Sequence, residues 1–196
     1  MNGRAKTAVF FFSFVFCGIL FGIIASYVFQ FFFSFSLAKA IPDNEKFFIP
    51  AKFVIYGSGY NTVSARVWLY DRNGAEIAVI ERSWNGEKLF LEFDTAEFQQ
   101  KIIPYPSHLY TEDSYKNGVR LDRYYNEKGL CRLYSDVGEP DKVKNAYYRL
   151  SLFALSRFPL TGGHSKKITL ELSNYKTGEL WSIITAVDGT VSVIVN

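Results

Sequence analysis

Few residues in this sequence could do chemistry at neutral pH, and they are widely spaced. Histidine, the commonest general base, occurs only at His108 and His164, and neither has a cysteine or another histidine at metal-ligand spacing. Ser107 precedes His108, but the G-x-S-x-G nucleophile elbow is absent. Cys131 lies in an alternating stretch, where a small buried cysteine is the ordinary interpretation. The sequence therefore predicts no catalytic residue, no metal and no cofactor.

One pair of acids has a spacing that chemistry could use. Glu92 and Asp94 are two residues apart in a predicted strand, so both side chains lie on one face, as paired hydrolytic carboxylates could. Outward-facing acids on a sheet are far commoner. Residues 71–74 (DRNG) lack the later ligands of a calcium loop, and residues 57–59 (GSG) do not open a helix. Both stretches are interpreted as turns.

A long apolar segment near the N-terminus determines where the rest of the chain lies. Residues 8–38 contain no charge, and as a helix they would be roughly 46 Å long, against a hydrocarbon core of about 30 Å. A signal peptide has a much shorter apolar region, although residues 38–40 (AKA) have the form of a cleavage site. A lipoprotein signal would need a small residue rather than Phe16 before Cys17. We therefore predict an uncleaved signal anchor, a transmembrane helix with its core at residues 9–29.

The flanks of this segment indicate its orientation. The N-terminal tail, residues 1–7, carries Arg4 and Lys6 and no acid, and long C-terminal domains translocate largely regardless of their own charge. We expect a bitopic protein with a cytoplasmic tail and an extracytoplasmic domain. Beyond the anchor the sequence has one cysteine and no N-glycosylation signal, which favours a bacterial envelope, on the periplasmic side of the inner membrane.

Small residues recur within the predicted membrane helix. Gly18, Gly22 and Ser26 are spaced four apart and share one helix face. Such a face allows close helix packing, so a homodimer through the membrane helix is one expectation. Glycine and serine are also common in membrane helices, which is the competing interpretation.

The charge distribution argues against nucleic acid as a partner. Of 22 basic residues, Arg4, Lys6 and Lys39 lie at the apolar segment, and the remaining 19 equal the 19 acids, all of which follow residue 40. A nucleic-acid binder would show a basic surplus in its folded domain. The net charge of +3 is therefore attributed to the anchor and its flanks.

Turn signals predict a β domain after a juxtamembrane linker. Residues 39–52 are the expected linker, and residues 53–196 the domain. The pairs at 73–74 and 85–86 are Asn-Gly, the strongest short hairpin signal, and they predict a three-stranded meander. Its core face would collect apolar side chains only: Ala65, Val67, Leu69, Ala78, Ile80, Leu89, Leu91 and Phe93.

The opposite face of this meander is unusually apolar for a solvated surface. It carries Trp68, Tyr70, Ile77, Val79 and Phe90 among charged residues. We expect either that another layer covers these side chains or that they form a contact surface.

The rest of the domain continues mainly in strands. Residues 101–110 contain two prolines and predict an edge or irregular strand. Further hairpins are expected from 119–125 with 130–134 and from 168–173 with 179–186. A two-residue turn at 188–189 would place Ile184 and Ala186 opposite the valines at 191, 193 and 195.

Residues 140–157 predict one helix packed on a sheet, because apolar residues recur there at helical spacing. The expected fold is thus a single N-terminal transmembrane helix followed by a mainly antiparallel β domain. That domain would be a sandwich or jelly roll of about eight or nine strands with one packed α-helix. In outline it resembles tethered β-jelly-roll proteins of lipid transport, a likeness that no motif carries.

The expected function is non-enzymatic: a membrane-anchored interaction or assembly module of a cell envelope, with a protein partner. The second hypothesis is a β domain that binds a lipid or another apolar ligand between its sheets. The third is a hydrolase, for which a buried histidine beside a carboxylate or thiol in a cleft would be the sign.

Overall fold

A long N-terminal helix and a mostly antiparallel β domain make up this chain. The computed structural model describes residues 3–42, 47–98, 101–136, 138–155, 166–186 and 188–196. The three α-helices are α1 (Gly3–Ala38), α2 (Asp122–Tyr125) and α3 (Asp141–Ala154), and two short 3₁₀ turns are η1 (Tyr115–Asn117) and η2 (Leu172–Asn174). The strands are β1 (Phe48–Gly59), β2 (Thr62–Tyr70), β3 (Glu76–Asn85), β4 (Leu89–Phe98), β5 (Lys101–Thr111), β6 (Val119–Arg120), β7 (Asn126–Glu127), β8 (Leu130–Cys131), β9 (Lys167–Glu171), β10 (Trp181–Thr185) and β11 (Val191–Val195).

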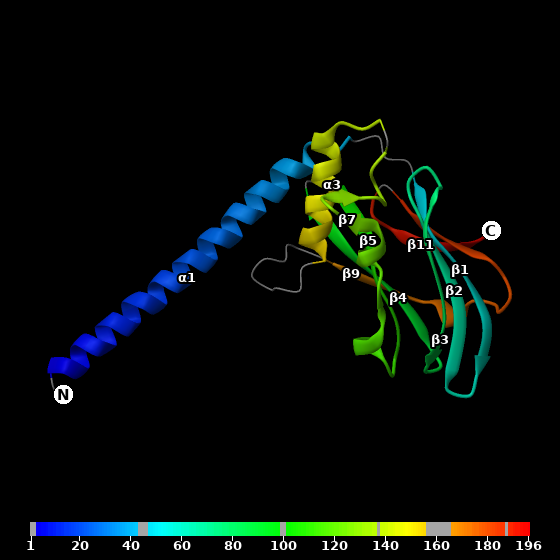
Figure 1. Cartoon of the computed structure of the whole chain (residues 1–196), viewed down its shortest axis with the longest axis horizontal. Helices are drawn as coiled ribbons and strands as arrows, with labels where there is room; N and C mark the ends of the chain where they lie inside the picture. The colour runs from blue at the N-terminus through cyan, green and yellow to red at the C-terminus, as the bar shows by residue number, and fades with distance from the viewer. Residues whose placement is uncertain (1–2, 43–46, 99–100, 137, 156–165, 187) are drawn as a thin grey trace.

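Two sheets form the body of the domain. The first has five strands in the order β11-β10-β1-β2-β3, and the second has four in the order β6-β5-β4-β9. Strands β7 and β8 form a separate small pair. Figure 1 shows the two larger sheets as adjacent layers, with α3 on the far side of the four-stranded sheet. The arrangement is a β-sandwich-like domain with one helix packed on it.

The core lies where alternating apolar side chains of the two sheets meet. In β2 every second residue is buried, and the intervening ones are partly exposed. The meander's predicted core face is confirmed as a buried set, with all its members at most 6% exposed except the partly buried Ala78. The pattern alone was sufficient to identify which side of each strand faces inward.

Strand pairing confirms the first predicted hairpin, but the predicted three-stranded meander is wrong because its third strand lies in the other sheet. β2 pairs with β3, with Leu69 opposite Ala78 and Val67 opposite Ile80. β4 pairs instead with β5 and β9 in the other sheet. The turn after β3 is an arch between sheets, stabilised by Glu112, whose carboxylate accepts the backbone N–H groups of Glu87 and Lys88 at 2.7 and 2.9 Å.

Two more predicted pairings are wrong for a similar reason. β9 joins β4, whereas β10 lies between β1 and β11, so residues 168–173 and 179–186 belong to different sheets. Of the hairpin expected from 119–125 with 130–134, only β7 and β8 pair, and residues 122–125 form α2. The strand count is accordingly 11 rather than eight or nine.

The last hairpin forms, with a register shifted by one residue. Ile183 lies opposite Val193 and Thr185 opposite Val191. The turn closes with a 2.9 Å hydrogen bond from the Ala186 N–H to the Thr190 carbonyl, and Gly189 has a φ of 78°. Three residues therefore separate the paired positions instead of two, a loop that needs a left-handed residue at its end.

Two further predictions agree with the structure: the proline-containing edge strand at 101–110 and the helix that follows Pro140. β5 is nearly an edge strand, because only the two-residue β6 pairs with its outer side. Two buried tyrosines cover the rest of that edge: Tyr125 donates to the Pro106 carbonyl and Tyr134 to the Pro104 carbonyl. α3 begins after Pro140, as its sequence predicts.

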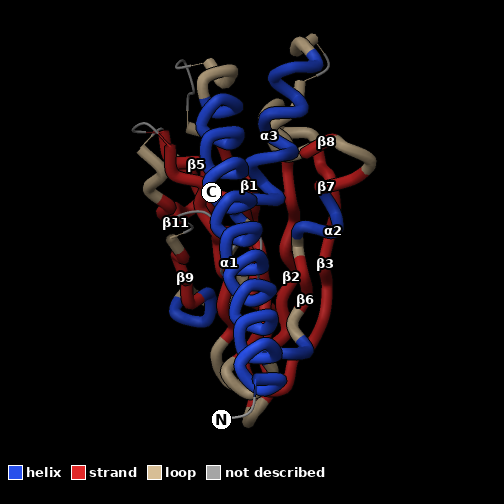
Figure 2. The backbone as a smooth tube through the Cα atoms, turned by 90° about the vertical axis from the view of Figure 1, so that its left-hand side faces the viewer, coloured by secondary structure: helices blue, strands red, loops and turns tan. Residues whose placement is uncertain are grey.

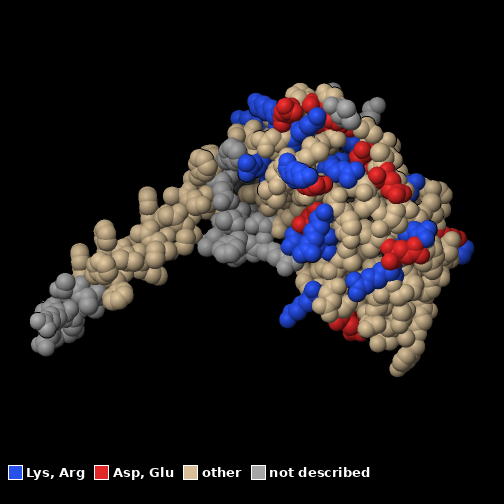
Figure 3. Space-filling model, viewed as in Figure 1, with Lys and Arg blue, Asp and Glu red and all other residues tan. Residues whose placement is uncertain are grey.

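Helix α1 extends away from the domain, and none of its residues from Phe10 to Phe29 is buried. Its segment from Phe10 to Phe29 is long and apolar enough to cross a membrane. In Figure 3 the part of this helix that is not grey carries no charged side chain, whereas acidic and basic side chains are interspersed over the face of the domain in view.

The end of α1 belongs to the domain core. Leu37, Ala38 and Ile41 are at most 9% exposed and join the main apolar cluster, and this end of the helix packs against α3. Lys101 donates from Nζ to the carbonyls of Ala38, at 3.4 Å, and Ile41. A cation there also complements the negative end of the helix dipole. β1 starts at Phe48, within the predicted linker at 39–52.

Candidate functional site

The outer side of the five-stranded sheet bears a mixed aromatic and charged surface. The register places Lys52, Trp68 and Val79 side by side across three strands. In Figure 1 no described helix lies on this side of the domain. We call it the open face and define it by Lys52, Tyr56, Arg66, Trp68, Tyr70 and Val79.

Cations hold the aromatic rings of the open face in place. The Arg66 guanidinium lies 5.7 Å from the Tyr56 ring and 5.5 Å from the Trp68 ring, and it is ion-paired with Glu81. The Lys52 ammonium lies 5.7 Å from the Tyr70 ring. Such cation–π contacts are individually weak at exposed sites. The two cations of the open face therefore lie among its aromatic rings, and Glu81 pairs with one of them.

The structure brings together three of the five predicted contact residues. Trp68, Tyr70 and Val79 lie on the open face. Ile77 sits at the irregularity between β2 and β3 and packs partly against the core. Phe90 belongs to the four-stranded sheet, where its ring stacks on Tyr110 with a centroid distance of 5.6 Å. The set was drawn from a three-stranded meander, and the arch after β3 divides it.

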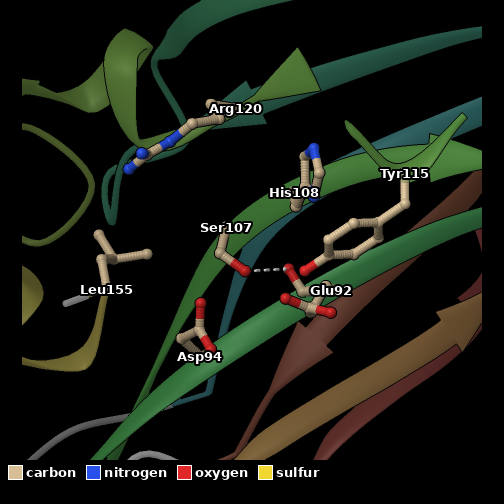
Figure 4. A pocket seen from close by; sticks show the side chains of 7 residues that line it. All are labelled: Glu92, Asp94, Ser107, His108, Tyr115, Arg120 and Leu155. Atoms are coloured by element: carbon tan, nitrogen blue, oxygen red, sulfur yellow. Dashed lines mark hydrogen bonds between the residues drawn. The ribbon is translucent and has the colours of Figure 1, made fainter. Parts of the chain in front are cut away.

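A second candidate site lies on the outer side of the four-stranded sheet. A cavity of about 30 Å³ there is lined by Glu92, Asp94, Ser107, His108, Tyr115, Arg120 and Leu155. In Figure 4 these side chains come from β4, β5, β6 and the segments beside them, with Ser107 and Tyr115 pointing toward Glu92 and Arg120 toward Leu155. Glu92 lies directly opposite His108 in the strand register. We call this group the polar pocket.

Lys167 of β9 neutralises the acids of the polar pocket. Its Nζ lies 2.6 Å from a carboxylate oxygen of Glu92 and 3.8 Å from one of Asp94. Burial raises the pKa of the Asp94 carboxyl, while the charge of Lys167 opposes that rise. Burial also lowers the pKa of the Lys167 ammonium, but its bond to Glu92 and the nearby acids more than offset this effect and leave that pKa raised. A buried carboxyl with a raised pKa could act as a general acid.

The serine and the histidine of the pocket each have close partners other than one another. The Ser107 hydroxyl donates to the Glu92 carbonyl at 3.0 Å. It also hydrogen-bonds the Asp94 carboxyl, which opposes the rise in the pKa of that group. The His108 ring packs against the rings of Tyr110 and Tyr115, and its Nε2 lies against Gly118 so closely that a Cβ there would collide with it. The arrangement is that of a packed polar cluster.

The other reactive residues do not join this group. Burial raises the pKa of the Cys131 thiol to about 12, which keeps it protonated and un-nucleophilic at neutral pH. His164 lies outside the described residues. Within the described ranges, no three or more His, Cys, Asp or Glu side chains gather as a metal site would need.

The remaining predicted site is the small-residue stripe in α1. Gly18 and Gly22 have open space where a side chain would lie, and Ser26 is exposed. Packing of this stripe against another helix stays a prediction.

Sequence reasoning missed the polar pocket as a group. The sequence pairs Glu92 with Asp94 and Ser107 with His108, but it predicts residues 101–110 only as an edge or irregular strand because of their prolines. A continuous strand through those prolines would have placed the two pairs opposite each other. Arg120, which forms a bidentate pair with Asp122 at 2.9 and 2.6 Å, had no sequence signal.

Comparison with known proteins adds no relative to this description. No family model, no curated protein and no solved structure matches the chain.

Proposed function

We propose that this protein is a membrane-anchored, non-enzymatic interaction module whose open face binds another protein. The observation that carries the proposal is the row of Lys52, Trp68 and Val79, with the Trp68 ring against Arg66, on a sheet face that no described helix covers. Trp, Tyr and Arg are the residues that dominate binding energy at protein interfaces, and the open face is built from them.

The membrane setting rests on α1. Its exposed apolar segment is suited to a bilayer, and the basic, acid-free tail favours a cytoplasmic N-terminus with the domain outside. The single cysteine of the domain and the absence of a glycosylation signal favour a bacterial envelope. Figure 1 shows α1 leaving on the side of the four-stranded sheet. The open face would then point away from the membrane, toward a partner in the envelope.

Several features favour an interaction module over binding of an apolar ligand. The space between the sheets is filled by large side chains with essentially no exposure, including Phe53, Phe93 and Leu91. The polar pocket is small and lined mainly by charged and hydrogen-bonding groups, which suits neither a lipid nor another apolar molecule.

Site-specific photocrosslinking in native membranes tests the proposal. A photoreactive residue replaces Val79, which is 42% exposed on the open face, and a control replaces Leu152, which is 44% exposed on α3. We expect a discrete adduct of one protein from position 79 and none from position 152. Trp68→Asp, which disrupts the centre of the face, should abolish that adduct while the domain resists protease as before.

Two outcomes would contradict the proposal. Position 79 would give no adduct above that of position 152, or its adduct would persist unchanged in a folded Trp68→Asp variant. An adduct at twice the mass of the chain would identify self-association instead of a distinct partner.

A hydrolase is the second candidate, because Asp94, with its raised pKa, and the cross-strand pair of Glu92 and His108 share one cavity. Asp94→Asn preserves the size of the side chain and removes the acid. On the interaction proposal this variant still complements a deletion strain. Loss of complementation by a folded Asp94→Asn protein, with crosslinking intact, would favour the hydrolase.

A further inference from the structure

One edge of the five-stranded sheet is unpaired. β11 bonds to β10 and has no described strand on its other side. The Ala186 N–H donates to the Thr190 carbonyl, and the Asn196 N–H to the Leu180 carbonyl, so the even-numbered residues of β11 point their backbone groups at β10. Backbone direction alternates along a strand. The N–H and C=O groups of Val191, Val193 and Val195 therefore face the open edge.

This edge lacks the protection that the other sheet edges have. β3 carries Glu76, Glu81 and Arg82, β9 carries charges at both ends, and β6 is only two residues long. β11 reads VSVIV and has no charge, with Ile194 44% and Val195 60% exposed. Proteins usually blunt free edges with charge, proline or shortness to prevent pairing with another chain. The exception at β11 points to an edge that is used.

We propose that a second copy of this chain pairs with β11 through its own β11, in antiparallel orientation. With Val193 opposite its counterpart, Val191 of each copy lies opposite Val195 of the other. All three pairs then use backbone groups that face the edge, which allows about six N–H···O bonds, two for each pair. On the outer side Ser192 meets Ile194, and no like charges oppose each other. The strand is complementary to itself in this register.

The position of α1 is compatible with this pairing in one membrane. The two-fold axis that relates antiparallel edge strands runs perpendicular to the sheet. Figure 1 shows α1 projecting on one side of the sheets, and Figure 2, viewed from that side, shows it in front of the strands. Rotation about such an axis keeps both anchors on the same side of the joined sheet. Confinement of two copies to one membrane also raises their effective concentration.

This pairing rests on the membrane setting of the proposed function but not on its open face, since it uses a strand edge. Cysteine crosslinking of the full chain in membranes tests it. In a Cys17→Ser background, Ser192→Cys with Ile194→Cys places thiols at two symmetry-related cross-strand contacts. The matched control is Glu81→Cys with Ser83→Cys, on the same side of the charged β3 edge. We expect mild oxidation to give at least fivefold more disulfide-linked dimer from the β11 pair.

Proline variants then show whether the strand edge causes the dimer. Val193→Pro and Val195→Pro each remove an N–H that faces the open edge, so the bonds to β10 remain. Each should lower the crosslinked dimer at least tenfold with the unfolding midpoint nearly unchanged. Ile194→Pro, which breaks a bond to β10, should instead destabilise the domain. If the β11 thiols crosslink no better than the β3 thiols, if the dimer survives both prolines, or if the adduct contains another protein, the proposal is wrong.

Discussion

The two outer sides of this sandwich carry similar residues in different environments. On the open face, the ion pair between Arg66 and Glu81 has side chains that are 38% and 53% exposed. In the polar pocket, the Glu92 side chain is only 8% exposed and faces a lysine. An exposed pair contributes little to stability and can be rearranged by a partner, whereas a buried carboxylate must keep its cation. Burial, more than residue type, thus separates a surface available for binding from one that is part of the fold.

Removal of one aromatic ring from each outer side of the sandwich should give the largest contrast in the free energy of unfolding. Tyr105 is fully buried, and its hydroxyl donates to the Tyr147 carbonyl at 3.2 Å. Tyr105→Ala should lower the free energy of unfolding by about 3–5 kcal/mol, because it leaves a cavity under α3. Trp68→Ala should cost about 1 kcal/mol or less, since the ring is at the surface. Denaturant unfolding of the full chain in detergent, followed by fluorescence, measures both. Equal losses would remove the distinction.

Added methyl groups test how crowded each side is. A Cβ at Gly118 would meet His108, Tyr110 and the Leu109 carbonyl at less than 3.0 Å, whereas one at Gly57 would meet nothing within 4 Å. Gly118→Ala should therefore destabilise the domain by about 1–3 kcal/mol, the usual cost of overpacking. Gly57→Ala should be neutral or stabilising by up to about 1 kcal/mol. Thermal unfolding of the two variants side by side checks this, and a tolerated Gly118→Ala would mean that the pocket can expand.

Loss of Lys167, which pairs with the acids of the polar pocket, should have a smaller effect on stability. Lys167→Met leaves the buried Glu92 carboxylate without its cation, and we expect a loss of about 1–2 kcal/mol because the lysine itself is half-exposed. Lys166→Met, one residue earlier and also exposed, is the control and should change stability by less than about 0.5 kcal/mol. The same unfolding assay applies. A Lys167→Met protein as stable as its control would show that Glu92 is effectively solvated.

The pH dependence of Asp94 is the finest test. Because its pKa is raised in the folded protein, the folded state holds this proton more tightly than the unfolded chain. The associated stability is present below the ordinary aspartate pKa of 3.8 and is lost as the pH rises through the folded pKa. Asp94→Asn should remove that loss, so the variant gains relative stability as the pH increases above 3.8. An unchanged difference between the two proteins across that window would contradict the assignment.

The faces of the strands could be predicted from the sequence better than their partners could. Alternation in residues 65–69 and 89–93 identifies the buried side of each strand whether the intervening turn is a hairpin or an arch. The Asn-Gly turn at 73–74 forms a hairpin, but the one at 85–86 joins two sheets. That choice depends on non-local contacts such as those of Glu112, which no short window contains.

The same limit applies to the candidate sites. The open face was partly predictable, because Trp68 and Tyr70 alternate along one strand and Val79 lies opposite Trp68 on the next. The polar pocket was not, since Lys167 comes from a strand 75 residues away from Glu92 in the sequence. Long-range pairing of β4 with β9 created it.

The buried end of α1 has a mechanical consequence. Leu37, Ala38 and Ile41 are part of the core, and Lys101 donates hydrogen bonds to the carbonyls of Ala38 and Ile41. In the described residues, the end of the helix is therefore packed into the domain rather than joined to it by a flexible hinge. In the proposed membrane setting, the helix would fix both the height of the domain above the bilayer and its orientation. A change in helix tilt would then move the whole domain as a lever. For the same reason, cleavage after residue 40 would remove Leu37 and Ala38 from the core of the domain.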